Sequence, residues 1–309
     1  MNVYIISVIL GIVEGLTEFL PVSSTAHLRI TEALLKLPMS AAGCQVNSAS
    51  DCLHAVAYWK MYTIVIQAGA ILALLLLYLV RILEFMRTFP RGERGDRNFF
   101  THPISLTILA FVCTSIPALA LKKWSDHNLG SLTAIAIALL VGGVIMWVVD
   151  VWASRYEPNT IHVEEIALGQ AIWIGLCQSL SAIFPGTSRS MSTIAAGQMA
   201  GMDRPTALEF SFLLSIPTML VATAYDLWKE VLHPGKAALA AGEAAAGVTM
   251  DGQRWIVLAI GFVVSFIVAY GVVEWFLAWV RRHGFTIFAV YRILLGIALL
   301  IWGAKIAVG

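Results

Sequence analysis

Two segments, residues 11–30 and 175–194, interrupt apolar runs in the same way, and this pattern constrains the fold more than any other feature of the chain. They read GIVEGLTEFLPVSSTAHLRI and GLCQSLSAIFPGTSRSMSTI and align without a gap. The matched positions include Gly11 and Gly175, Pro21 and Pro185, and Ser24 and Ser188. Inside a bilayer, irregular backbone is stable only where it lines a cavity or is buried in protein, so paired breaks point to a polar site near the membrane midplane.

The composition places the chain in a bilayer. Hydrophobic residues make up 59% of it and charged residues only 13%, with a mean hydropathy of +0.81. A soluble domain carries roughly 25% charged residues. The net charge of +1 argues against a nucleic-acid partner, because such a partner requires a basic surface. We therefore expect a membrane protein that binds no nucleic acid.

Six apolar stretches are long enough to cross a membrane, which takes about 20 residues. They are residues 61–80, 103–121, 132–152, 206–228, 255–280 and 285–307. The segments around Pro21 and Pro185 are shorter and are expected to form re-entrant helix hairpins. The predicted fold is an all-α integral membrane protein with six transmembrane helices and two re-entrant hairpins in an inverted-topology repeat.

The chain is expected to form a single polytopic membrane domain over residues 1–309, with repeat halves at roughly 1–152 and 153–309. Six crossings would put both termini on one side and open the two hairpins to opposite sides. Basic residues are divided almost evenly between the two faces, but the densest short loop, residues 81–102, carries five arginines. Cytoplasmic loops are enriched in basic residues, so this loop is placed inside and the termini outside.

Hydroxyl residues at the breaks are candidates for phosphate binding. Those after the two prolines are Ser23, Ser24 and Thr25 in the first segment, and Thr187, Ser188 and Ser190 in the second. Such residues cap free amide groups at helix starts, and those amides with the helix dipole form an anion site. The alternative is that each hydroxyl only bonds to its own backbone, as single Ser and Thr residues in membrane helices do.

Arg189 adds a permanent charge at the second break. Its planar fork fits the oxygens of a phosphate group in a bidentate way. An unpaired arginine at this depth costs at least ~2.5 kcal/mol, so it requires a partner. That partner is either an anionic ligand or an intramembrane carboxylate, for which Glu14 and Glu18 are the candidates.

Glu14 and Glu18 are four residues apart and therefore project from one face of a helix. Mg²⁺ takes one or two carboxylates together with water and phosphate oxygens, so the pair is predicted to bind Mg²⁺, with Ca²⁺ as an alternative. A proton relay or a protonated contact between helices is the other interpretation. His27 lies one turn beyond Ser24 and is a candidate proton acceptor, although a lone histidine is more often structural.

Two further pairs of residues have less specific interpretations. Cys44 and Cys52 lie in a polar loop and would form a disulfide if it faces an oxidising compartment, and two free thiols are the equal alternative. Glu274 and Arg292 lie in later apolar stretches, where an ion pair between them is the simplest interpretation.

Three stretches carry a resemblance to a known family. EGLTEFLPVSSTAH at 14–27, PGTSRS at 185–190 and EFSFLLSIP at 209–217 closely resemble the signature regions of the bacterial undecaprenyl pyrophosphate phosphatase family of BacA/UppP type. The resemblance implies a multi-pass enzyme of the bacterial inner (plasma) membrane. It would hydrolyse undecaprenyl pyrophosphate to undecaprenyl phosphate and inorganic phosphate, recycling the lipid carrier of cell-wall synthesis. A homodimer is a further expectation.

The resemblance also assigns residues. The family's motif residues fall on Glu14, Glu18, the serine pair Ser23 and Ser24, His27, Arg189 and Thr193. Two positions depart from it, since the family usually has glycine where this chain has Ala26 and Met191. Met191 is expected to lie close to the bound phosphate and to narrow the pocket.

These residues suggest a mechanism for phosphoryl transfer. Mg²⁺ on Glu14 and Glu18, together with Arg189 and the helix amides, would neutralise the charge of the transition state. The nucleophile is either Ser24, activated by His27, or a bound water.

Two rival interpretations belong to other classes. Inverted repeats with half-helix anion sites also build carriers, so a flippase or carrier for a polyprenyl phosphate or a small anion is the main alternative. A purely structural membrane protein is the third, although it would have no need for so many polar groups at two matched breaks.

Overall fold

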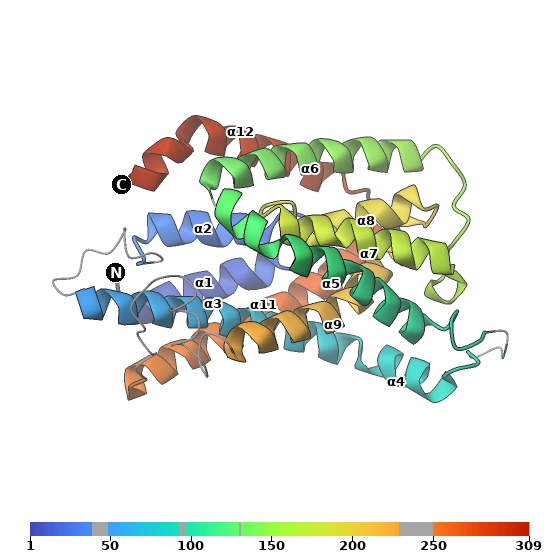
Figure 1. Ribbon diagram of the computed structural model, residues 1–309, viewed down its shortest axis with the longest axis horizontal. Coiled ribbons are helices and arrows are strands. Elements are labelled where there is room, and N and C mark those ends of the chain that lie inside the picture. The colour runs from blue at the N-terminus through green and yellow to red at the C-terminus, as the bar shows by residue number, and fades with distance from the viewer. Residues whose placement is uncertain (39–48, 93–94, 96, 130, 229–249, 309) are drawn as a thin grey trace.

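The computed structural model describes residues 1–38, 49–92, 95, 97–129, 131–228 and 250–308 (Figure 1). Its helices are α1 (Val3–Thr17), α2 (Ser24–Leu34), α3 (Ala49–Leu77), α4 (Leu79–Thr88), α5 (Pro103–Asn128), α6 (Leu132–Ala153), the 3₁₀ helix η2 (Val163–Glu165), α7 (Leu168–Ile183), α8 (Arg189–Met199), α9 (Arg204–Leu227), α11 (Gly252–Val280) and α12 (Thr286–Val308). Cys44 and the side chain of Cys52 lie outside the described part, so the disulfide stays a prediction.

Within the described residues, five helices are long and apolar enough to cross a membrane: His54–Leu77, Pro103–Ser125, Leu132–Ala153, Arg204–Leu227 and Gly252–Val280. Each coincides with one of the predicted apolar stretches. The sixth predicted stretch falls on α12, which is apolar over its described side chains, Thr286–Trp302. The chain is therefore an all-α membrane protein.

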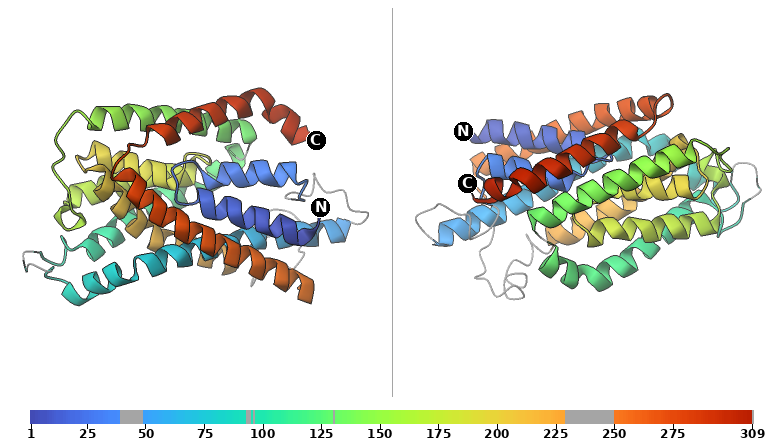
Figure 2. Two further views of the ribbon diagram at one scale, coloured as in Figure 1. Left: turned by 180° about the vertical axis from the view of Figure 1, so that it is seen from behind. Right: turned by 90° about the horizontal axis from the view of Figure 1, so that it is seen from above.

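The four short helices around the breaks form two hairpins. The first hairpin is α1 and α2, and the second is α7 and α8. In Figures 1 and 2, both chain termini lie at one end of the molecule. The first hairpin opens towards that end and the second towards the opposite end, so their turns meet near the middle.

The two halves of the chain interlock. Helix α1 lies along α11, and its counterpart α7 lies along α5, while α6 and α12 pack together. Glycine permits the close approach in both hairpins: a Cβ atom on Gly11 would lie 2.8 Å from the Gly261 carbonyl oxygen, and one on Gly175 would overlap the backbone of Ala110. Each hairpin is thus held by a helix from the opposite half.

The first break, residues 18–23, and the second break, residues 184–188, start from the same physical cause. Proline has no amide hydrogen and its ring clashes with the preceding turn. Pro21 accordingly leaves the Thr17 carbonyl without a helical donor, and α1 ends at Thr17. Pro185 follows the end of α7 at Ile183 in the same way.

The helices that follow the breaks start at equivalent caps. Ser23 and Ser188 are the N-cap residues of α2 and α8, with φ angles of 74° and 73°. Each hydroxyl accepts a hydrogen bond at 3.4 Å from the amide three residues later. The gapless alignment is therefore wrong beyond the prolines, because the second break has one more residue between its proline and its cap than the first. Ser24 corresponds to Arg189, and both are the first residue of their helix.

Candidate active site

A polar pocket of about 260 Å³ lies between the two breaks. Both hairpins and the neighbouring helices α3 and α9 contribute to its wall, which consists of Glu18, Ser23, Ser24, Thr25, Gln67, Ser181, Ala182, Gly186, Ser188, Arg189, Thr218, Met219 and Ala222. Glu18, Ser23, Ser24, Thr25, Ser188 and Arg189 are among the residues predicted from the sequence. The pocket thus brings together side chains from two segments that lie far apart in the chain.

Glu18 is the centre of the polar contacts in this pocket. The Ser24 hydroxyl donates a hydrogen bond of 2.5 Å to Glu18 Oε2, and Arg189 Nη2 lies 3.5 Å from Glu18 Oε1. The first residues of α2 and α8 therefore converge on one carboxylate. The ion pair that was the alternative interpretation of Arg189 is present, and its partner is Glu18.

The contact with Glu18 leaves other N–H donors of the Arg189 guanidinium without an acceptor among the described residues. Its guanidinium carbon lies 5.8 Å from the centre of the Phe19 ring, and its side chain is 11% exposed. Nη1 is buried and has no hydrogen-bond partner in the structure. A buried guanidinium donor without an acceptor is costly, so this arginine has capacity for a further anionic oxygen.

Glu14 lies one turn before Glu18 on α1 and is almost completely buried, with 1% of its surface exposed. Its carboxyl group is close enough to that of Glu18 for the two charges to interact, and Glu14 Oε2 has no hydrogen-bond partner among the residues that the structure describes. Within the described residues, no group of three or more His, Cys, Asp and Glu side chains is arranged to hold a metal ion. Two carboxylates with one free oxygen fit Mg²⁺, which fills its remaining positions with water and phosphate oxygens.

His27 does not contact Ser24, contrary to the activation predicted from their spacing. Its Nδ1 is 2.7 Å from the Ser23 carbonyl oxygen, and its Nε2 is 2.6 Å from the Tyr291 hydroxyl. Both ring nitrogens are thus engaged, and the ring also stacks on Tyr291. The hydrogen-bond partner of Ser24 in this structure is Glu18.

Three predicted phosphate-binding residues stand outside the pocket wall. Ser190 links the breaks, since its hydroxyl donates to the Leu20 carbonyl at 3.0 Å and lies 3.1 Å from the Ser188 hydroxyl. Thr193 is 2.6 Å from the Ser211 hydroxyl of α9. Thr187 lines an apolar cleft beside α6. Ser190 thus joins the two breaks, Thr193 joins α8 to α9, and Thr187 faces the apolar cleft.

The two departures from the family pattern also face away from the pocket. Met191 is buried and lines the apolar cleft beside Gly142, so it does not narrow the polar pocket as expected. Ala26 packs against α6 residues such as Ile135 and Leu139. Both residues occupy the third position of their helix, where the side chain points into the core.

Three residues matter more than the sequence suggested. Gln67 lines the pocket from α3, and Tyr291 of α12 holds His27. Arg292 does not pair with Glu274; its guanidinium donates to backbone carbonyls of both breaks, including Pro21 and Thr187. The sequence marked Arg292 as unusual, because an arginine rarely lies in an apolar stretch. Its hydrogen-bond partners depend on how distant helices pack and could not be predicted from the sequence.

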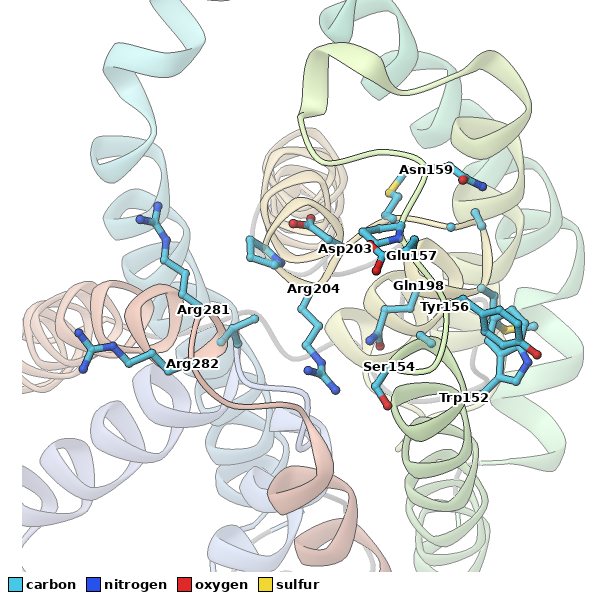
Figure 3. A pocket seen from close by; sticks show the side chains of 18 residues that line it. Trp152, Ser154, Tyr156, Glu157, Asn159, Gln198, Asp203, Arg204, Arg281 and Arg282 are labelled. Carbon is cyan, nitrogen blue, oxygen red and sulfur yellow. The ribbon is translucent and has the colours of Figure 1, made fainter.

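Figure 3 shows a second cavity, of about 820 Å³, lined by residues from the loop after α6, the turn between α8 and α9, and the end of α11. Arg204 and Gln198 line it, and both bind Asp150, at 2.7 and 3.1 Å. Arg281 and Arg282 extend away from Gln198 in Figure 3. The buried Asp150 joins α6, α8 and α9 there, and no residue predicted to be functional lines this cavity.

The fold and the pocket define a class: a polytopic α-helical membrane protein with an acidic, hydroxyl-rich site and an arginine between two broken helices. The family described as bacitracin resistance protein BacA matches residues 7–298. The chain belongs to this family.

Several relatives cover the chain almost completely. Undecaprenyl-diphosphatase of Koribacter versatilis is 55% identical over 305 residues, which are 99% of this chain and 100% of the relative. The protein of the same name from Rhizobium etli is 39% identical, over 96% of each chain. That of Porphyromonas gingivalis is 36% identical, over 98% of each chain.

Proposed function

We propose that this chain is an undecaprenyl-diphosphatase, which hydrolyses undecaprenyl pyrophosphate to undecaprenyl phosphate and inorganic phosphate. The relatives named for that activity match it from end to end. The observation that carries the proposal is the contact of Ser24 and Arg189 with one carboxylate, Glu18, at the wall of the polar pocket. A nucleophile, a base and a cation within hydrogen-bond reach are what phosphoryl transfer requires.

Ser24 is the proposed nucleophile and Glu18 its base. The Ser24 oxygen attacks the terminal phosphorus, its proton passes to Glu18, and the bond from that phosphorus to the bridging oxygen breaks. Undecaprenyl phosphate leaves, and the terminal phosphoryl group stays on Ser24. Water then attacks the phosphoserine, inorganic phosphate departs, and the proton on Glu18 returns to the serine oxygen. The 2.5 Å contact supports this direction of proton transfer.

Arg189 and the starts of α2 and α8 are proposed to bind the phosphate oxygens. Nη1 of Arg189 is available, and the amides beyond the caps Ser23 and Ser188 belong to two helix N-termini, which favour anions. Thr25 and Ser188 line the same pocket. Glu14 and Glu18 would hold Mg²⁺, or Ca²⁺ in its place, which when bound supplies positive charge beside the phosphate.

We further propose six crossing helices with the two hairpins as re-entrant elements of an inverted repeat. Support comes from the opposed hairpins and from the reciprocal packing of α1 on α11 and of α7 on α5. The repeat halves would form one membrane domain over residues 1–309, in the bacterial inner membrane. A homodimer is compatible with this arrangement and is tested by the mass of the protein in detergent.

The direct test is phosphate release from undecaprenyl pyrophosphate by the purified protein in detergent. We expect release with Mg²⁺, loss with EDTA, and loss in Glu18→Gln and Arg189→Ala. The matched controls are Glu157→Gln and Arg155→Ala, whose side chains are exposed on the loop after α6. A folded protein that binds the lipid but releases no phosphate would instead support the polyprenyl-phosphate carrier.

A further inference from the structure

Arg292 of α12 is the largest fully buried side chain of the described residues, with 0% of its surface exposed. It has no carboxylate within ion-pair distance in the part of the chain that the structure describes. Its Nη1 donates to the Pro21 carbonyl at 3.2 Å, and its Nη2 donates to the carbonyls of Gly186 at 3.2 Å and Thr187 at 2.7 Å. One guanidinium thus spans the two breaks.

The use of an arginine here requires an explanation. A charged side chain in the membrane interior costs ~2.5–3.5 kcal/mol even on the mildest scale. A side-chain amide carries its two N–H donors on one nitrogen, whereas the rigid guanidinium fork presents donors on separate nitrogens, which suits acceptors in two segments. Among the described residues, the Nε of Arg292 has no hydrogen-bond partner.

The contact with Thr187 sets the direction of the next amide. In a planar trans peptide the C=O and N–H groups point in opposite directions. Because the Thr187 carbonyl faces Arg292, the amide hydrogen of Ser188 points away from Arg292, and Ser188 lines the polar pocket. Ser188 also has a positive φ angle, which a residue other than glycine adopts only when its surroundings hold it there.

The same turn of α12 also fixes the first break. Tyr291 binds His27, which contacts the Ser23 carbonyl, while Arg292 binds the Pro21 carbonyl directly. Ser23 is the second non-glycine cap with a positive φ angle. Adjacent residues of α12 therefore hold both strained turns.

We propose that Arg292 is a positioning residue that keeps the two breaks in register, so that Ser24 faces the phosphate held by Arg189. This inference rests on the proposed phosphatase function. Arg292 does not line the polar pocket, whereas Gly186, whose carbonyl it binds, and Ser188 do. It acts through the backbone and does not touch substrate.

The kinetic test uses Arg292→Gln and Arg292→Lys. We expect kcat to fall by about 10² in the glutamine variant, the loss typical of a misplaced reactive group, with KM changed less than threefold. Lysine keeps the charge but not the fork and should recover only part of the rate. A folded Arg292→Gln protein with kcat within threefold of wild type contradicts the proposal. A raised KM with unchanged kcat also contradicts it, since that would make Arg292 a substrate ligand.

A second variant displaces Arg292 without removing it. A Cβ atom on Gly142 of α6 would lie 2.5 Å from Arg292 Nη2 and 2.7 Å from Met191 Cε. Gly142→Ala should therefore lower kcat with KM nearly unchanged, and adding Met191→Ala should recover part of the rate by giving the guanidinium room. Gly271→Ala is the matched control, because a Cβ there meets nothing within 4 Å. Equal activity in Gly142→Ala and Gly271→Ala would overturn the positioning role.

A distance measurement separates this inference from the proposed function. Spin labels at Thr25 and Ala182, on opposite hairpins at the pocket wall, are introduced after replacing the four native cysteines by serine. We expect one narrow distance distribution with Arg292 and a broadened or shifted one with Arg292→Gln. If wild type releases no phosphate, the phosphatase proposal fails, and the distances alone decide the positioning role. An unchanged distribution in the variant refutes it.

Discussion

The first break and the second break have a similar backbone conformation but carry different side chains. Both contain a proline, turn at a serine with a positive φ angle, and lead into an eleven-residue helix. The first break carries the acids Glu14 and Glu18, whereas the corresponding residues before the second are Gln178 and Ala182. The first residue of the new helix is Ser24 on one side and Arg189 on the other. In the proposed mechanism, the first break thus supplies a nucleophile with its base, and the second supplies a phosphate-binding cation.

The largest expected effect comes from the first break. Ser24→Ala and Glu18→Gln should each lower kcat by about 10³ or more, because a nucleophile or its base is removed. Phosphate release at saturating substrate measures this loss, and Ser181→Ala, at the pocket wall without a proposed role in bond making, serves as the control. Near-normal turnover by Ser24→Ala would move the nucleophile to water.

The second break should respond differently to substitution. Arg189→Ala should lower kcat/KM by about 10²–10³, the range for loss of one charge-stabilising donor. Arg189→Lys should recover part of that loss by restoring the charge without the fork. Measuring kcat and KM separately sharpens the comparison, since a binding cation affects both and the Ser24 variant only kcat. Identical profiles for the two positions would end the proposed separation of roles.

The pairs before the breaks test whether the metal belongs to the first copy. Glu14→Gln should raise the Mg²⁺ concentration needed for half-maximal activity by about 10-fold, as for loss of a metal-site group. Gln178→Leu, its counterpart, should leave that concentration unchanged, although it removes the 3.0 Å hydrogen bond from Gln178 to Thr218. A Mg²⁺ titration of both variants checks this, and an equal shift in the two would place the ion elsewhere.

The smallest losses of activity are expected from substitutions of Tyr291 and His27, which do not line the polar pocket. Tyr291→Phe removes only the hydroxyl that contacts His27 and should lower kcat about threefold, consistent with loss of one hydrogen bond of about 0.5–1.5 kcal/mol. His27→Gln should cost about 10-fold, well below the loss in Glu18→Gln, because His27 positions the Ser23 carbonyl and does not contact Ser24. Initial rates of the three variants give the order. A loss in His27→Gln as large as that in Glu18→Gln would restore His27 as the base.

Local signals in the sequence predicted the helices and breaks correctly. Long apolar runs and the two prolines act on the residues beside them, so the long apolar helices and the ends of α1 and α7 lay close to where they were expected. The convergence of Glu18, Ser24 and Arg189 also followed from the matched breaks, because two hairpin turns that meet bring their residues together.

Contacts between distant segments were beyond such reasoning. The partners of His27 and Arg292 are set by how α12 packs against both hairpins, which no spacing within a helix encodes. Met191 was misplaced for another reason: it lies two residues after Arg189, and residues two apart in a helix do not share a face, so Met191 lines the apolar cleft and not the polar pocket. The extra residue between Pro185 and Ser188 could not be detected in the sequence, because only the positions of the two helix N-caps reveal it.

The exchange of packing partners between the halves has a consequence for how the protein is made. Helix α1 emerges early from the ribosome. Its partner α11 and the α12 residues that hold the breaks, Tyr291 and Arg292, are synthesised after the second hairpin. The first hairpin is therefore made long before the residues that hold it. The contacts of Tyr291 and Arg292 with the two breaks can form only when nearly the whole chain has been synthesised, so a chain released before α12 lacks the contacts that join the breaks from that side.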